Sequence, residues 1–193
     1  MGVILAATDS LNWLASVTGK SPAELTGALE EQQVTPSTTL FLPYLGGERT
    51  PHNDAAARGV FLGLSHTTTT TDMAHAVMQG VAFAFKDCQD ALHSAGTTIS
   101  SASAVGGGAN SEYWLKLIAE TSGYCVDIPK DGDYGASLGA ARLGMIAATG
   151  ADPYAVCVAP AMDKTIEPDG AHKDAFDEQH HRYKTAYSAL RSI

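Results

Sequence analysis

Val105-Gly106-Gly107-Gly108-Ala109-Asn110-Ser111-Glu112-Tyr113-Trp114 joins the end of an apolar strand to the start of a helix through three glycines. Glycines allow a ligand to approach the backbone closely, because no Cβ stands in the way. The helix that follows directs unpaired N–H groups and the positive end of its dipole at the same place. This arrangement is typical of a site for a phosphate or a nucleotide.

The glycine loop alone leaves three interpretations open. The first is a dinucleotide site of the Rossmann type, but Ser111 stands where that fingerprint has its third glycine. Asp127 follows at about the distance, roughly 20 residues, at which such a site has an acidic residue. The second is an ATP site in a different α/β fold, and the third is a tight strand–helix turn. No Gly-Lys-Ser/Thr follows the glycines, so the loop is not a P-loop.

The segments around the loop predict a strand–helix–strand–helix series. A strand over residues 102–105 precedes the glycines, and Ser111 caps a helix that ends at Gly123. A strand over residues 125–128 and a helix over residues 134–149 follow. Because the last helix is rich in glycine and alanine, we expect it to lie close against a sheet or another backbone.

The rest of the chain predicts helices with short strands between them. Gly19 ends a first helix, Ser21 caps a short one that reaches about residue 31, and the threonines before Asp72 cap a long one. The remaining expected elements are strands at 40–42 and 60–64, a long polar loop at 43–59 with one helical turn near its end, the long helix at 72–95, an irregular surface segment at 151–170 and a docked amphipathic helix at 171–193.

Composition excludes several classes of function. The chain has 193 residues, a formal net charge of −9 and no basic block, so we expect no binding to nucleic acid or to an anionic membrane. No apolar run is long enough to span a membrane. The three cysteines fall outside any CxxC spacing, which indicates buried thiols in a reducing, cytoplasmic environment.

Other polar residues give weaker signals. The histidines lack metal-ligand spacing, so we expect no metal site, and the adjacent His180 and His181 should face solvent near the end of the chain. The charged residues of the long loop form either active-site charges or a self-neutralising network, namely Glu48, Arg49, Asp54 and Arg58.

Longer motifs resemble the FGGY family of carbohydrate kinases. Residues 59–64, followed after seven residues by 72–79, resemble the second signature of this family. Residues 41–53 (Phe-Leu-Pro-Tyr-Leu-Gly-Gly-Glu-Arg-Thr-Pro-His-Asn) are similar to the branch that acts on xylulose, and residues 106–114 and 135–141 fit the same branch. The resemblance is strong over residues 1–150 and loose over the terminal helix.

The resemblance implies an α/β domain of the actin-like, ribonuclease H-like ATPase class. Residues 1–150 would be the C-terminal, ATP-binding domain, entered partway and therefore incomplete at its N-terminal strands. This would explain why the chain is apolar from Gly2 to Ala7. Residues 151–193 would be a surface segment and a terminal helix docked on the same domain.

The implied reaction is ATP-dependent phosphorylation of a ketopentose, D-xylulose to D-xylulose 5-phosphate, with Mg²⁺. The family's ATP contacts fall on Gly106, Gly107, Gly108 and Ala109. Glu112 takes a position near the adenine that often holds asparagine in related kinases. An N-terminal domain would bind most of the sugar and the catalytic aspartate would lie upstream, so we expect the isolated chain to be inactive.

Other functions stay open at this point. The fold could serve a nucleotide-binding module without catalysis, an NAD(P)-binding domain, or a kinase of glycerol, gluconate or ribulose. The Gly46–Asn53 loop would face the cleft between domains, and a homodimer is open too.

Overall fold

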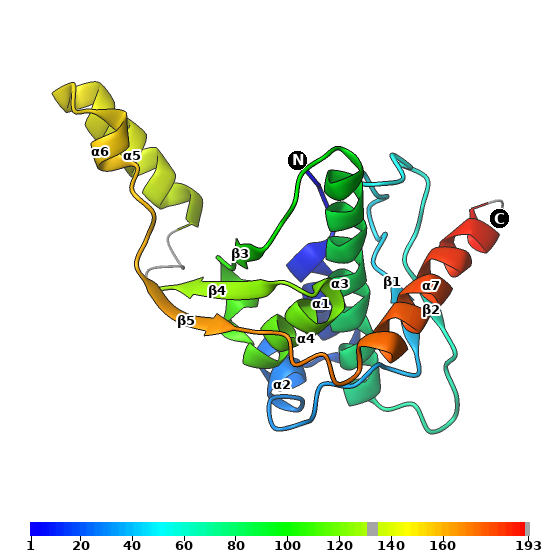
Figure 1. Cartoon of the computed structure of the whole chain (residues 1–193). Coiled ribbons are helices and arrows are strands. Elements are labelled where there is room, and N and C mark those ends of the chain that lie inside the picture. The colour runs from blue at the N-terminus through cyan, green and yellow to red at the C-terminus, as the bar shows by residue number, and fades with distance from the viewer. Residues whose placement is uncertain (131–134, 192–193) are drawn as a thin grey trace.

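The long helix α3 (Thr70–Ser94) runs through the middle of the molecule in the computed structural model, which describes residues 1–130 and 135–191 (Figure 1). Its start follows the expected pattern. The Thr69 hydroxyl accepts the Asp72 N–H, and the Asp72 carboxylate accepts the Thr69 N–H in return. This reciprocal cap satisfies two donors that the first turn of a helix leaves free.

The other elements surround α3. In chain order they are α1 (Ala7–Thr18), α2 (Pro22–Gly27), β1 (Leu40–Leu42), β2 (Val60–Leu62), β3 (Ser101–Ser103), the 3₁₀ turn η1 (Gly107–Asn110), α4 (Glu112–Ser122), β4 (Cys125–Pro129), α5 (Gly135–Thr149), α6 (Pro153–Val156), β5 (Met162–Ile166) and α7 (Lys173–Leu190). The expected caps of α1, α2 and α4 are confirmed: Gly19 and Gly123 are left-handed at helix ends, and Ser21 and Ser111 accept N–H groups at helix starts.

The strands in the described residues form two small sheets. β1 and β2 pair antiparallel, and β3 lies parallel to β4 with α4 as the connection between them. The parallel pairing confirms the expected strand–helix–strand unit around the glycine loop. Parallel strands need such a crossover, and the loop after β3 lies at its first turn.

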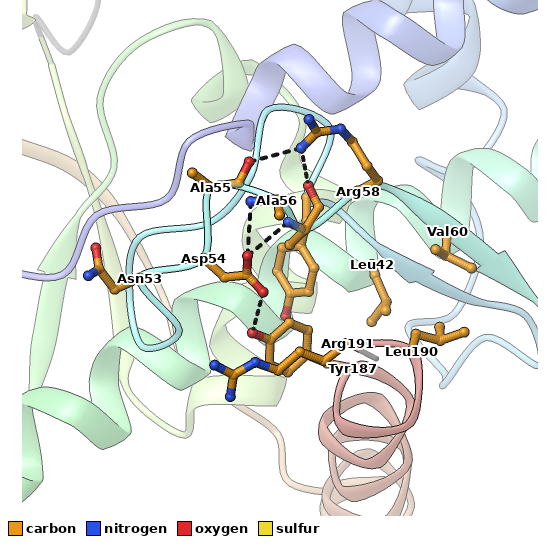
Figure 2. Close-up of a pocket in the computed structure, with 12 residues that line it drawn as sticks. Leu42, Asn53, Asp54, Ala55, Ala56, Arg58, Val60, Tyr187, Leu190 and Arg191 are labelled. Atoms are coloured by element: carbon orange, nitrogen blue, oxygen red, sulfur yellow. Dashed lines mark hydrogen bonds between the residues drawn. The ribbon is translucent and has the colours of Figure 1, made fainter. Parts of the chain in front are cut away.

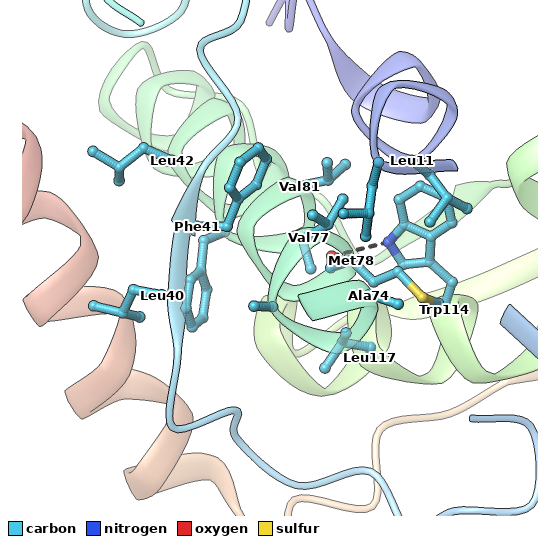
Figure 3. Packing of buried hydrophobic residues seen from close by; sticks show 14 of the residues in the cluster. Leu11, Leu40, Phe41, Leu42, Ala74, Val77, Met78, Val81, Trp114 and Leu117 are labelled. Carbon is cyan, nitrogen blue, oxygen red and sulfur yellow. Dashed lines mark hydrogen bonds between the residues drawn. The ribbon is translucent and has the colours of Figure 1, made fainter. Parts of the chain in front are cut away.

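The core lies where α3 meets β1, α1 and α4 (Figure 3). A Cβ on Gly80 would lie 2.2 Å from the carbonyl oxygen of Phe41, so this glycine lets α3 approach β1 closely. On another side of α3, the Trp114 indole N–H donates a hydrogen bond of 3.0 Å to the Met78 carbonyl. The buried tryptophan thereby satisfies its one polar atom while it joins α4 to α3.

Three local expectations were wrong. Residues 162–166 form β5, antiparallel to β4, although we expected an irregular segment. Only Ile166 of this strand is buried, so its sequence lacks the alternation of apolar and polar residues that predicts a strand. Residues 43–59 contain two isolated bridges and no helical turn. Helix α5 buries none of its residues and extends away from the body with α6 (Figure 1), so its small residues do not pack on a sheet.

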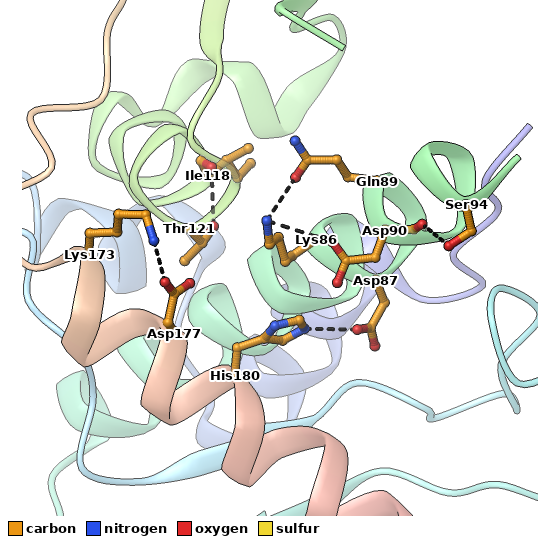
Figure 4. A network of polar contacts seen from close by, with 10 residues as sticks. All are labelled: Lys86, Asp87, Gln89, Asp90, Ser94, Ile118, Thr121, Lys173, Asp177 and His180. Atoms are coloured by element: carbon orange, nitrogen blue, oxygen red, sulfur yellow. Dashed lines mark hydrogen bonds and ion pairs between the residues drawn. The ribbon is translucent and has the colours of Figure 1, made fainter. Parts of the chain in front are cut away.

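The terminal helix α7 docks as expected but buries one residue that we had placed in solvent. Phe176, Tyr183 and Tyr187 are buried, and so is His180, four residues after Phe176 on the same face. His180 Nε2 lies 2.8 Å from Asp87 Oδ1 of α3 (Figure 4). The expectation that both terminal histidines face solvent therefore holds for His181 only.

None of the helices in the described part of the chain is both long enough and apolar enough to cross a membrane.

Candidate nucleotide-binding site

The glycine loop turns sharply after β3. Gly106 has φ +87° and ψ −178°, a backbone conformation that only glycine adopts without strain. The Ala109 N–H then donates to the Gly106 carbonyl at 2.9 Å, which closes the η1 turn. Ser111 ends this turn and caps α4, since its hydroxyl oxygen accepts the Trp114 N–H at 3.2 Å.

A pocket of about 340 Å³ opens beside this loop, within the usual size range of small-molecule sites. The loop forms one side, and α1, α3 and α4 supply most of the others. The lining residues are Ala7, Thr8, Val81, Phe85, Ser103, Ala104, Val105, Gly106, Gly107, Gly108, Ala109, Trp114, Leu115 and Ile118. None of them carries a charge, so the pocket suits an uncharged, largely apolar group better than a phosphate.

Two glycines of the loop have different surroundings. A Cβ on Gly107 would meet nothing within 4 Å, so this residue borders open space. A Cβ on Gly108 would lie 2.9 Å from Thr8 Cγ2 and 3.8 Å from the Trp114 ring. Gly108 therefore allows the loop to pack on α1, whereas Gly107 leaves its backbone accessible to a ligand.

The structure brings together four of the five residues that the sequence singled out. Gly106, Gly107, Gly108 and Ala109 all line the pocket, but Glu112 does not. The Glu112 carboxylate lies 2.7 Å from Lys164 Nζ and 2.9 Å from Lys116 Nζ, at a separate depression. Hydrogen bonds from Lys164 and Lys116 lower the pKa of Glu112 to about 2.

Asp127, the acidic residue of the dinucleotide interpretation, is also outside this pocket. It lies on β4, and its carboxylate accepts a hydrogen bond of 2.6 Å from the Thr165 hydroxyl of β5. A dinucleotide site needs that carboxylate at the ribose. The geometry therefore does not favour NAD(P).

The apolar walls of the pocket were missed as site residues. Val81, Phe85 and Ile118 have the helical spacing of core residues, and the sequence gives no sign that they face the glycine loop. Only the packing of α3 against α4 brings them there.

A second pocket, of about 890 Å³, lies between residues 53–58 and the end of α7 (Figure 2). The Asp54 carboxylate accepts the N–H groups of Ala56 and Ala57 and the Tyr187 hydroxyl, the last at 2.9 Å. The hydrogen bond from Tyr187 is the main reason that the pKa of Asp54 is lowered. The charges of the long loop thus fix its shape and its contact with α7.

Two other charged residues of this loop, Arg58 and Glu48, also bond to backbone groups. Arg58 donates to the carbonyls of Ala55 and Ala57. Glu48 is buried and accepts the N–H groups of Leu5 and Arg49, while its burial raises its pKa. The bond from Leu5 attaches the loop to the N-terminal segment, whereas the bonds of Arg58 stay within the loop. These contacts do not form the mutual ion-pair network that one interpretation expected.

One group of side chains in the described ranges could hold a metal ion, namely Asp87, Asp90 and His180 (Figure 4). His180 and Asp87 already bond to each other, and Lys86 lies 3.7 Å from Asp90. Because these contacts account for the cluster, we assign no metal to it.

Residues 1–148 match the FGGY family of carbohydrate kinases, C-terminal domain. The chain belongs to this family. The xylulose kinase of Escherichia coli (strain K12) is 38% identical over 98% of this chain, and that of Klebsiella pneumoniae is 34% identical over 100% of this chain. The chain spans 40% of the length of each of these curated relatives.

The fold agrees with that of solved family members. The crystal structure of a xyloylose kinase from Brucella ovis has 49% sequence identity and a TM-score of 0.91; the match covers all of this chain and 40% of the other. The fold is therefore the mixed α/β, actin-like ATPase fold that the motifs implied.

Proposed function

We propose that this chain takes part in the ATP-dependent phosphorylation of a sugar and supplies the part that binds ATP. The proposed reaction converts D-xylulose to D-xylulose 5-phosphate. Its support is the family membership, together with relatives named as xylulose kinases that align over the whole chain. In this proposal residues 1–150 form the ATP-binding domain, and residues 151–193 form a surface segment and a terminal helix that dock on the same domain.

The observation that carries the ATP assignment is the uncharged pocket beside Gly106, Gly107, Gly108 and Ala109. Its apolar walls fit a purine ring, and the open space at Gly107 lets that ring or the ribose approach the backbone. The pocket offers no cation to a phosphate and no carboxylate to Mg²⁺. The adenosine end of ATP therefore fits here, and the triphosphate would extend away from the loop.

The steps of the proposed reaction are divided between this chain and the rest of the kinase. In the proposed transfer the sugar O5 forms a bond to the γ-phosphorus while the bond from that phosphorus to the leaving ADP oxygen breaks, and a base takes the hydroxyl proton. Mg²⁺ would neutralise charge on the phosphates. This chain's own residues bind and orient the nucleotide and exclude water around its adenine ring. We place the group that takes the hydroxyl proton, and most contacts to the sugar, in a segment equivalent to the part of the relatives that this chain does not span.

Calorimetry on this chain with ATP and Mg²⁺, adenosine and NAD tests the assignment. We expect ATP and adenosine to bind with similar affinities, because the proposed contacts are to the adenosine end. NAD binding much tighter than that of adenosine, or no binding of ATP and adenosine, would overturn the proposal. A coupled assay should find no D-xylulose phosphorylation by this chain alone, and turnover here would refute the proposed division of the site.

A further inference from the structure

Glu30 reaches the start of α4 from the turn after α2. Its Oε1 accepts a hydrogen bond of 2.6 Å from the Ser111 hydroxyl, and its Oε2 accepts the Tyr113 N–H at 3.1 Å. One carboxylate thus binds two donors of the first turn of the helix. It lies 81 residues before Ser111 in the sequence, so this contact is tertiary rather than a local cap.

The contact extends through Ser111 to the wall of the pocket. Because the Ser111 hydroxyl donates its hydrogen bond to Glu30, its oxygen is oriented to accept the Trp114 N–H. Trp114 in turn lines the pocket and borders Gly108. A change at Glu30 therefore alters the first turn of α4 and the residues that flank the glycine loop.

The same carboxylate also changes what the helix end can bind. The N–H groups of a free helix start attract anions, and the helix dipole adds to this attraction. Here the Tyr113 and Trp114 N–H groups already have acceptors, and a carboxylate supplies the negative charge. A phosphate thus finds the Tyr113 and Trp114 N–H groups already occupied, with a carboxylate beside them.

We propose that Glu30 is a positioning and specificity residue for the nucleotide pocket: it holds Ser111, and through it Trp114, in the arrangement that takes adenosine, and it occupies the anion position at the start of α4. This inference rests on the proposed function, because it assumes that the pocket binds a nucleotide. Glu30 does not line the pocket, so its effect on affinity is exerted through Ser111 and Trp114.

The test compares variants of Glu30 with a matched control. Glu30→Ala removes both acceptors, while Glu30→Gln keeps an oxygen for Ser111 but turns an NH₂ group towards the Tyr113 N–H. The control is Glu31→Ala, at the next residue, which is exposed as Glu30 is. The dissociation constant of adenosine is measured by calorimetry at a temperature well below the unfolding midpoint of every variant.

We expect Glu30→Ala to weaken adenosine binding about tenfold, Glu30→Gln to weaken it less, and Glu31→Ala to leave it unchanged. A residue that only stabilised α4 would lower the midpoint without changing the dissociation constant, so unchanged affinity in folded Glu30→Ala overturns the inference. Competition between inorganic phosphate and adenosine in the unchanged chain also overturns it. Failure of the unchanged chain to bind any adenine nucleotide overturns the proposed function itself, and the inference with it.

The emission of Trp114 gives a second readout. Trp13 is the other tryptophan of the chain and stacks on Phe41, away from the pocket lining. In a Trp13→Phe background, adenosine should change the fluorescence of Trp114, and Glu30→Ala should alter the spectrum before any ligand is added. An identical spectrum with and without Glu30→Ala would contradict the connection through Ser111.

Discussion

His180 of α7 and Asp87 of α3 form a buried pair in which Nε2 lies 2.8 Å from Oδ1. The His180 side chain is 7% exposed and that of Asp87 is 3% exposed. Phe83 and Tyr183 surround the imidazole ring. The pair joins the terminal helix to the central helix inside an otherwise apolar contact, where an unpaired polar group is costly.

We predict that His180→Ala destabilises the chain by about 3–5 kcal/mol, because it leaves the Asp87 carboxylate buried without its partner. Asp87 Oδ2 already lacks a hydrogen-bond partner among the described residues. The free energy of unfolding in urea measures the effect. His181→Ala, at the exposed neighbour, should change it by less than about 0.5 kcal/mol. Equal effects of the two substitutions would show that the pair contributes nothing.

We also predict that the chain loses stability as the pH falls from neutral towards 5. Burial lowers the pKa of His75 and of His52 below their ordinary value of 6.5, so the folded state prefers both rings neutral. The unfolded chain then takes up more protons below about pH 6.5, and that stability is lost on acidification.

Substitution at His75 checks the origin of this pH effect. The His75 ring packs edge-on against Tyr113 and is partly buried. In His75→Gln, the free energy of unfolding should fall less between pH 7.5 and pH 5 than in the unchanged chain. Glu31→Ala, on the surface, should keep the original slope. A His75→Gln slope as steep as that of the unchanged chain would assign the effect to other groups.

Most of the structure that could be predicted from the sequence depends on residues that are close together in the chain. Thr69 with Asp72, and Ser21 with Glu24, cap helices through contacts three residues apart, so their patterns are visible in the chain itself. The glycine loop between a strand and a helix was visible for the same reason.

What could not be predicted depends on contacts that are distant in sequence. His180 and Asp87 are 93 residues apart, so no local pattern shows that this histidine has a buried partner. β5 is a strand because β4 offers its edge, and its own residues lack an apolar alternation. The walls of the pocket beside the glycine loop depend likewise on how α3 and α4 pack.

The two neighbouring glycines of the loop allow fold and binding to be tested separately. Gly106→Ala forces a side chain into a backbone conformation with φ +87° and should cost about 1–3 kcal/mol of stability. Gly107→Val places its side chain in open space and should leave the unfolding midpoint nearly unchanged. The same valine fills the volume proposed for adenosine.

We therefore predict that Gly107→Val weakens adenosine binding at least about tenfold, a change of roughly 1.4 kcal/mol, without loss of stability. Calorimetry gives the affinity, and thermal unfolding followed by circular dichroism gives the stability. Gly106→Ala serves as the counterpart, because its main effect should be on the unfolding midpoint. If Gly107→Val bound adenosine as the unchanged chain does, the ligand would not approach the loop at this residue, and the proposed contact at Gly107 would be wrong.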